Sequence, residues 1–146
     1  MKILLVISTL FFSISIFATD HTVEMKNSGK NGIMIFEPAV LKVEVGDTVT
    51  FLPTDFAHNS ESIAGLIPEG ATPWKGELSQ KVTVTIDKEG VYIYQCLPHA
   101  IMAMIGIIVA GKPTNLADIK AKSASLRDTF ATNKERLDNY LAEIDQ

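Results

Sequence analysis

The sequence predicts an all-β sandwich or barrel that is followed by two C-terminal helices. Up to Ala110, short runs of alternating apolar and polar residues, about five residues long, are separated by closely spaced turn formers, a pattern typical of sandwiches and barrels. After Gly111 the composition changes, because valine no longer occurs and alanine, lysine, aspartate, glutamate and leucine dominate. This shift marks the beginning of a helical segment.

The N-terminal residues 1–18 are expected to be a secretory signal peptide. Lys2 supplies a positive start, residues 3–17 form an almost unbroken apolar run, and Ala18 is a small residue suited to cleavage. A membrane-spanning helix needs about 20 apolar residues, and this run is shorter. We therefore expect the mature chain to begin near Thr19 and to be exported to the periplasm.

The mature chain is expected to be one acidic domain. Its 128 residues carry 12 Lys and Arg against 17 Asp and Glu, a formal charge of minus five. The acidic balance argues against nucleic-acid binding. A lone cysteine, Cys96, cannot form an internal disulfide in a compartment where disulfides are permitted, so a metal-bound thiolate competes with an inert buried thiol.

The strands are expected where the alternating pattern occurs, and the long segment 53–73 is expected to be a loop. That loop carries His58 and Asn59, and loops on rigid sandwiches often carry function. The strand rich in aromatic and β-branched residues delivers Cys96 to its end. The expected strands cover residues 21–26, 33–36, 40–45, 48–52, 81–86, 91–96 and 104–110.

Residues 113–146 are expected to form a helical extension of the same domain, with residues 19–112 as the β part. Thr114 is a candidate cap for a helix that ends near Lys122, and residues 132–135 fit a capping box for a second helix. The second helix has an apolar stripe expected to pack on the β domain and to have no cofactor role. The stripe consists of Leu137, Tyr140, Leu141 and Ile144.

The segment 96–104, Cys-Leu-Pro-His-Ala-Ile-Met-Ala-Met, gathers most of the metal-binding chemistry. A thiolate, an imidazole and a thioether suit copper or zinc, and not magnesium or calcium. Copper sites for electron transfer add a second imidazole, which His58 or His21 must supply. His58 follows a strand and is flanked by Asn59, whereas His21 lies at the start of the mature chain, so His58 is the expected ligand.

Together these motifs resemble the type 1 blue copper proteins, the cupredoxins, and within them the pseudoazurins. His-Asn at 58–59, Tyr-Gln-Cys-Leu-Pro-His at 94–99 and Met104 have the spacing of that family, and the resemblance extends through Ile-Met-Ile-Phe-Glu-Pro at 33–38, residues 46–55 and the C-terminal helices. It implies a cupredoxin-like Greek-key sandwich with the two helices packed on it. It also implies one type 1 copper ion held by His58, Cys96, His99 and Met104.

The resemblance also assigns roles to residues around these ligands. Asn59 is expected to join the two ligand loops by hydrogen bonding. Met34 matches a position beside the site, where an ordinary core role is an equal alternative. Met102 is a competing thioether, and the four residues between His99 and Met104 favour Met104.

The resemblance implies an electron carrier and not an enzyme, because protein atoms fill every coordination position. Relatives donate electrons to periplasmic nitrite reductase or similar enzymes, and the chain is expected to be a monomer that docks redox partners around His99. Relatives often place lysines on that rim, where this chain has Phe56 and Gln95 and retains Lys75. The apolar docking patch is expected to contain Phe56, Leu66, Ile67, Leu97, Pro98, Ala100, Ile101 and Met102.

Two other functions, and zinc as another metal for the same site, remain as alternatives. A copper carrier or storage protein would use the same ligands without electron exchange. An enzyme with a Cys–His pair would need a free thiolate, a base and an oxyanion site. Zinc would favour a fourth strong ligand, and methionine is a poor one.

Overall fold

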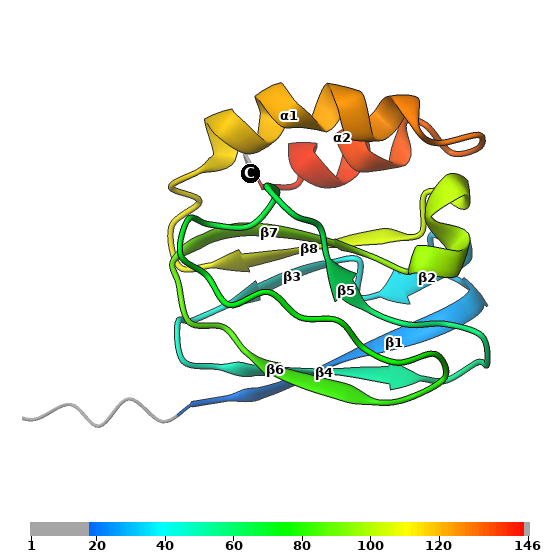
Figure 1. The fold of residues 1–146 in the computed structure, drawn as a ribbon, viewed down its shortest axis with the longest axis horizontal. Helices are drawn as coiled ribbons and strands as arrows, with labels where there is room; N and C mark the ends of the chain where they lie inside the picture. The colour runs from blue at the N-terminus through cyan, green and yellow to red at the C-terminus, as the bar shows by residue number, and fades with distance from the viewer. Residues whose placement is uncertain (1–17, 145–146) are drawn as a thin grey trace, which may run out of the picture.

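Two four-stranded sheets pack face to face, and two helices cover the second sheet (Figure 1). The computed structural model describes residues 18–144, so the expected signal peptide lies outside the described residues except for Ala18. The first sheet has the order β2-β1-β4-β6 and the second β3-β8-β7-β5. The strands are β1 (Asp20–Gly29), β2 (Gly32–Glu37), β3 (Val40–Val43), β4 (Thr48–Pro53), β5 (Glu61–Ser62), β6 (Val82–Thr85), β7 (Gly90–Gln95) and β8 (Ile105–Ala110).

The chain crosses between the sheets repeatedly, as expected for a Greek-key sandwich. β1 pairs with β2 in antiparallel and with β4 in parallel orientation, and β3 pairs with β8 in parallel orientation. A short 3-10 helix, η1 (Leu97–Met102), joins β7 to β8, and the chain ends with α1 (Leu116–Asp128) and α2 (Arg136–Ala142). Among residues 18–144, none of the helices is long and apolar enough to cross a membrane.

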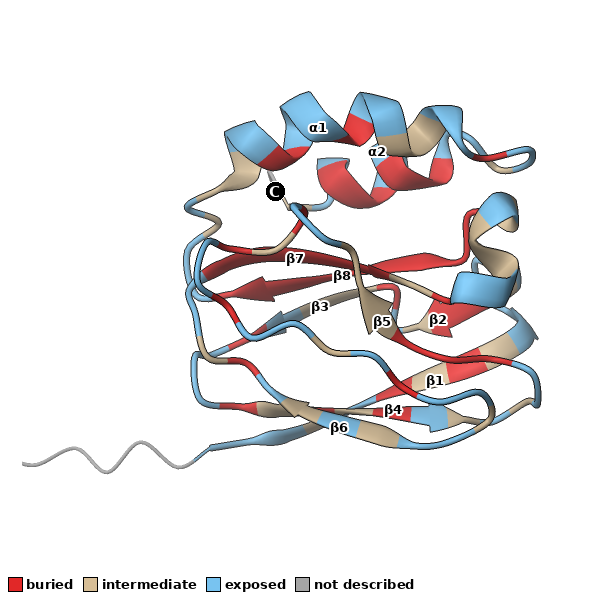
Figure 2. Cartoon of the chain, viewed as in Figure 1, coloured by how far each residue is buried: buried red, intermediate tan, exposed pale blue. Residues whose placement is uncertain are grey.

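Burial follows the number of layers that cover each strand (Figure 2). β8 is buried along its whole length, and β7 is buried except at Gln95, because β7 and β8 lie between the first sheet and the helices. In β7, Tyr92 and Tyr94 belong to the core between the sheets, whereas Val91 and Ile93 pack in the cluster beneath the helices. β4 and β6 instead alternate along their length, which is typical of strands with one solvent-facing side.

The seven expected strands are all present, whereas two short elements were not expected. β5 has two residues and exists because it pairs with β7 at Glu61↔Gln95 and Ser62↔Tyr94. η1 occupies the segment that was expected to be a loop. Elements this short carry no periodicity that a sequence pattern can reveal.

The expected helix starts were wrong in detail. α1 begins after Asn115 and runs to Asp128, beyond the expected end at Lys122. Asn115 accepts a 2.7 Å hydrogen bond from Val91 N and donates to Val91 O, which ties the helix start to β7. The expected capping box does not form, because Asn133 has a left-handed φ of 53° and Glu135, at the N-cap of α2, makes no side-chain capping bond.

The apolar stripe of the second helix packs as expected. Leu137, Tyr140 and Leu141 are buried in the cluster between the helices and the second sheet, and Ile144 packs against that cluster. The helices therefore complete the hydrophobic core of the β domain.

Candidate metal centre

Three predicted ligand residues meet at the end of the sandwich where η1 lies (Figure 1). The Nδ1 atoms of His58 and His99 are 3.1 Å apart, and Cys96 Sγ lies 3.7 Å from His58 Nδ1 and 3.4 Å from His99 Nδ1. Among residues 18–144, these three side chains form the one His, Cys, Asp or Glu group whose ligand atoms all lie close enough to hold a metal ion, within 4.8 Å of one another. The structure therefore gathers two imidazole nitrogens and a sulfur from two loops.

The local backbone explains how Cys96 and His99 face the same point. Cys96 follows β7 directly and is the N-cap of η1, with Pro98 in the first turn. Proline has no N–H and a fixed φ, so it suits the start of a helix. His99 N donates to Cys96 O at 3.1 Å, and this tight turn brings the imidazole back toward the sulfur.

The backbone of Met104 is hydrogen-bonded to two of the other predicted ligands, Cys96 and His99. Cys96 N donates to Met104 O at 2.9 Å, and Met104 N donates to His99 O at 3.2 Å. Met104 is fully buried in the same core cluster as Cys96, whereas the competing Met102 is half-buried on η1. The contacts favour Met104 as the thioether of the site.

Burial leaves one edge of the site near solvent. His58 and Cys96 are completely buried, and His99 is half-buried. The exposed large apolar side chains of Phe56, Leu97 and Ile101 come from the two loops that carry these histidines. The prediction that Leu66 belongs to the docking patch was wrong, because Leu66 is buried in the core beneath the helices.

The side-chain amide of Asn59 connects the two ligand loops. Asn59 is buried, accepts a hydrogen bond from Leu97 N at 2.8 Å and donates to Gly76 O at 3.1 Å. It therefore joins the loop of His58 to the residue after Cys96, as the resemblance implied.

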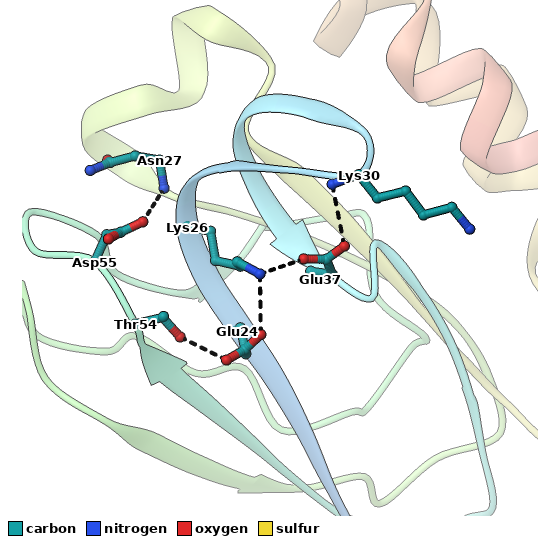
Figure 3. A network of polar contacts seen from close by, with 7 residues as sticks. All are labelled: Glu24, Lys26, Asn27, Lys30, Glu37, Thr54 and Asp55. Carbon is teal, nitrogen blue, oxygen red and sulfur yellow. Dashed lines mark hydrogen bonds and ion pairs between the residues drawn. The ribbon is translucent and has the colours of Figure 1, made fainter.

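Asn27, which the sequence did not single out, contacts the far side of His58. Its side-chain oxygen lies 3.0 Å from His58 Nε2, so it accepts a hydrogen bond from the tautomer that leaves Nδ1 free as a ligand. Asp55 accepts a hydrogen bond from Asn27 N at 2.7 Å, which joins the C-terminal part of β1 to the segment after β4 (Figure 3). Asn27 lies in a run of turn formers, and only the folded arrangement reveals this role.

Three further contacts involve residues of β1 that precede Asn27. Lys26 lies 2.7 Å from Glu37 and 3.4 Å from Glu24, and Glu24 accepts a hydrogen bond from Thr54 (Figure 3). These bonds link β1 to β2 and to the end of β4. β1 is therefore linked to both of these neighbouring strands close to Asn27.

Burial favours the neutral forms of Cys96 and His58 in the metal-free protein. Burial raises the pKa of the Cys96 thiol, although hydrogen bonds from the backbone of Asn59 and His99 partly oppose it. Burial and the nearby His99 lower the pKa of His58, and Asp55 opposes that shift. A neutral imidazole is ready to bind a cation, and a soft cation displaces the thiol proton.

The donor set fits copper. Two imidazoles, one thiolate and a methionine thioether are the ligands of blue-copper electron-transfer sites. His21, the other candidate histidine, is not part of the group, since its Nε2 lies 2.8 Å from Asp47 Oδ2.

Comparisons with known proteins show similarity to copper-binding proteins. Residues 23–111 match the family described as copper binding proteins, plastocyanin/azurin family. The chain is 43% identical over 132 residues to a putative pseudoazurin of Rhizobium leguminosarum bv. viciae, covering 89% of this chain and 83% of the relative. It is 39% identical over 129 residues to pseudoazurin of Paracoccus pantotrophus, covering 88% and 86%. The native pseudoazurin structure from Hyphomicrobium denitrificans matches with a TM-score of 0.77 and 41% identity, covering 88% of this chain and 100% of that one.

Proposed function

Because the chain belongs to the plastocyanin/azurin family of copper-binding proteins, we propose that it carries single electrons through one type 1 copper ion held by His58, Cys96, His99 and Met104. The chain is a cupredoxin and is similar to pseudoazurins over 88% to 89% of its length. The observation that carries the proposal is the convergence of His58 Nδ1, His99 Nδ1 and Cys96 Sγ at one buried point.

The ligand set explains why a carrier is favoured over a catalyst. Copper supplies a one-electron change between Cu(I) and Cu(II) when it is bound. The imidazoles of His58 and His99 and the thiolate of Cys96 would hold three positions on the ion, and the thioether of Met104 would supply a weak fourth bond. No position is left for a substrate, in contrast to catalytic metals that keep one for water.

The surrounding bonds suit an electron carrier because they limit movement of the ligands. Asn59 joins the two ligand loops, and Asn27 holds the His58 ring from behind. Ligands that are fixed before the electron arrives need little rearrangement when the charge of the metal changes. This support by the outer hydrogen bonds is typical of tuned metal sites.

The alternatives fit less well. A nucleophilic cysteine needs a lowered pKa, and burial raises the pKa of Cys96. A copper carrier or storage protein needs ligands that a partner can reach, and His58 and Cys96 are completely buried. Zinc lacks a fourth strong ligand in this set.

We further propose that redox partners dock on the apolar surface around His99, which is the ligand nearest to solvent. Phe56 is 85% exposed, Leu97 51% and Ile101 58%, so the patch is apolar and accessible. Weak redox encounters use interfaces below about 1,200 Å² in total, and a patch of this kind suffices. A copper-containing reductase such as nitrite reductase is the proposed acceptor, with the protein acting as a monomer in the periplasm after removal of residues 1–18.

The rim of this patch favours an apolar encounter over strong charge steering. Gln95 Nε2 donates to Glu61 Oε1 at 3.2 Å, so a neutral amide and a carboxylate lie at the edge. With Phe56 in place of a cation, we expect electron transfer to an acidic reductase to depend only weakly on salt.

The visible spectrum of the purified protein after addition of Cu(II) tests the function. We expect an intense thiolate-to-copper band at the red end of the spectrum that disappears with a mild reductant and returns on reoxidation. A colourless complex would refute the proposal. Stopped-flow mixing of the reduced protein with copper nitrite reductase then tests the partner, through the rate at which the band reappears.

A further inference from the structure

The segment between α1 and α2, together with Arg136 at the start of α2, donates hydrogen bonds to three successive backbone carbonyls of the ligand loop. The bonded carbonyls belong to residues 101–103, directly before Met104, and the donors lie in residues 131–136. Three adjacent carbonyls bonded to one short segment leave this part of the loop little freedom to move. The bonds are Ala131 N to Ile101 O at 2.8 Å, Asn133 Nδ2 to Met102 O at 3.1 Å, and Arg136 Nη1 to Ala103 O at 2.9 Å.

Arg136 extends the same contacts to the β2 strand. Its side chain is buried, with the residue 6% exposed, and it donates to Met34 O at 2.9 Å and to Ile33 O at 3.1 Å. Hydrogen bonds from a charged donor are about twice as strong as neutral ones. Arg136 therefore connects the last helix, the β2 strand and the end of the ligand loop through one guanidinium.

Two of the carbonyls that Arg136 binds belong to strained residues. Ala103 has a φ of 57° and Met34 a φ of 48°, and both lie in the left-handed region that non-glycine residues rarely adopt. Such conformations persist only where surrounding contacts impose them. The backbone conformation of Ala103 sets the direction in which the chain continues into Met104. The hydrogen bond from Arg136 to Ala103 O therefore helps to fix the position of the Met104 backbone.

We propose that the C-terminal segment clamps the copper loop, with Arg136 and Asn133 as positioning residues that fix Met104. This inference rests on the proposed copper site and gives the helical extension a role beyond completing the core. The bond from copper to an axial thioether is long and weak, so the protein and not the metal decides how close the sulfur lies. The thioether bond would stabilise Cu(II) more than Cu(I). A looser clamp would weaken that bond and would therefore raise the reduction potential.

Two variants and one control separate the clamp from general stability. Arg136→Leu removes the guanidinium, whereas Asn133→Gly deletes the amide and keeps a residue that accepts the left-handed backbone. Arg127→Leu is the matched control, because it also removes a guanidinium, one that is ion-paired with Asp138 and not bonded to the carbonyls of residues 101–103. Arg136→Lys tests rescue, since one ammonium keeps the charge but cannot reproduce the planar set of three bonds.

The first readout needs no copper. In the metal-free protein, hydrogen exchange at the amides of Ala103 and Met104 should be about tenfold faster in Arg136→Leu and Asn133→Gly, with Arg136→Lys in between. The second readout is the reduction potential of the copper form, which should rise in both variants while the thiolate-to-copper band persists. The Arg127→Leu control should match the unmodified protein in both measurements.

The outcomes distinguish this inference from the proposed function. If the unmodified protein gives no blue copper band, the proposed function fails, and the exchange experiment still tests the clamp. If exchange at Ala103 and Met104 is unchanged, or the control shifts equally, the clamp is refuted. If the exchange rises and the potential does not, the clamp holds the loop without positioning the ligand, and the inference about Met104 is overturned. Should Arg136→Leu fail to fold, Asn133→Gly alone decides.

Discussion

The side-chain oxygen of Asn59 accepts a 2.8 Å hydrogen bond from Leu97 N, and this bond joins the two loops that carry the metal-binding residues. The side-chain nitrogen of Asn59 donates to Gly76 O at 3.1 Å. Both polar atoms of this buried side chain are therefore hydrogen-bonded. Asn59 thus couples the position of His58 to that of Cys96.

Replacing Asn59 should destabilise the metal-free protein. Asn59→Ala leaves Leu97 N and Gly76 O without their partner, and we expect the free energy of unfolding to fall by about 2 kcal/mol. Urea unfolding followed by circular dichroism measures it. Asn139→Ala, on the exposed face of α2, is the control and should change the stability little. Equal losses in the two variants would contradict the role of Asn59.

The choice of histidine ligand is tested by two alanine variants. His58→Ala removes a nitrogen that lies 3.7 Å from Cys96 Sγ, so the thiolate-to-copper band should be lost. His21→Ala should keep the band, because the His21 ring contacts Asp47 at the opposite end of β1. Titration with Cu(II) under visible absorption compares them, and the reverse pattern would reassign the ligand.

Tyr94→Phe should stabilise the protein. The Tyr94 hydroxyl is buried and has no hydrogen-bond partner among residues 18–144, and burial raises its pKa. Removing an unsatisfied buried hydroxyl should increase the free energy of unfolding by about 1 kcal/mol.

Tyr92→Phe is the matched control on the same strand. The Tyr92 hydroxyl donates to Lys88 O at 2.7 Å and accepts from Lys88 N at 3.0 Å, so its loss should cost about 1 kcal/mol. Opposite signs in the two variants, measured by urea unfolding, support the assignment. A loss of stability in Tyr94→Phe would show that its hydroxyl is satisfied in solution.

Asp47 should control the stability of the protein in acid. Hydrogen bonds from the backbone of Thr19 and Glu44, together with the His21 side chain, lower its pKa from 3.8 to about 2. A carboxyl with a lowered pKa in the folded state contributes stability above its unfolded pKa, and that contribution is lost as the pH falls from about 4 to about 2. Urea midpoints of the metal-free protein across this range should decline.

The decline should be shallower in Asp47→Asn, which has no carboxyl to protonate at this position. Asp118→Asn, on the exposed face of α1, is the control and should keep the full decline. If Asp47→Asn and the unmodified protein decline equally, the acid sensitivity arises from other carboxyl groups.

Much of the fold and the core of the site could be predicted because both leave local patterns. Val23 and Met25 are buried on one side of β1, and Leu137, Tyr140 and Leu141 form the buried stripe of α2, as their spacing indicates. The elements that were missed or misjudged are those that depend on distant partners. β5 exists through β7, and the start of α1 is set by the bonds of Asn115 to Val91.

The sequence by itself determined the kind of metal site, since the chemistry of a thiolate, two imidazoles and a thioether belongs to the residue types and their spacing. Only the tertiary structure decided what holds those ligands. Asn27 meets His58 and Arg136 meets Ala103 across separations of 31 and 33 residues. Such contacts have no period along the chain, because they depend on how strands and helices pack and not on where apolar residues recur. The residue types in segment 96–104 therefore indicate which metal is bound, whereas the folded chain fixes the positions of the ligand side chains.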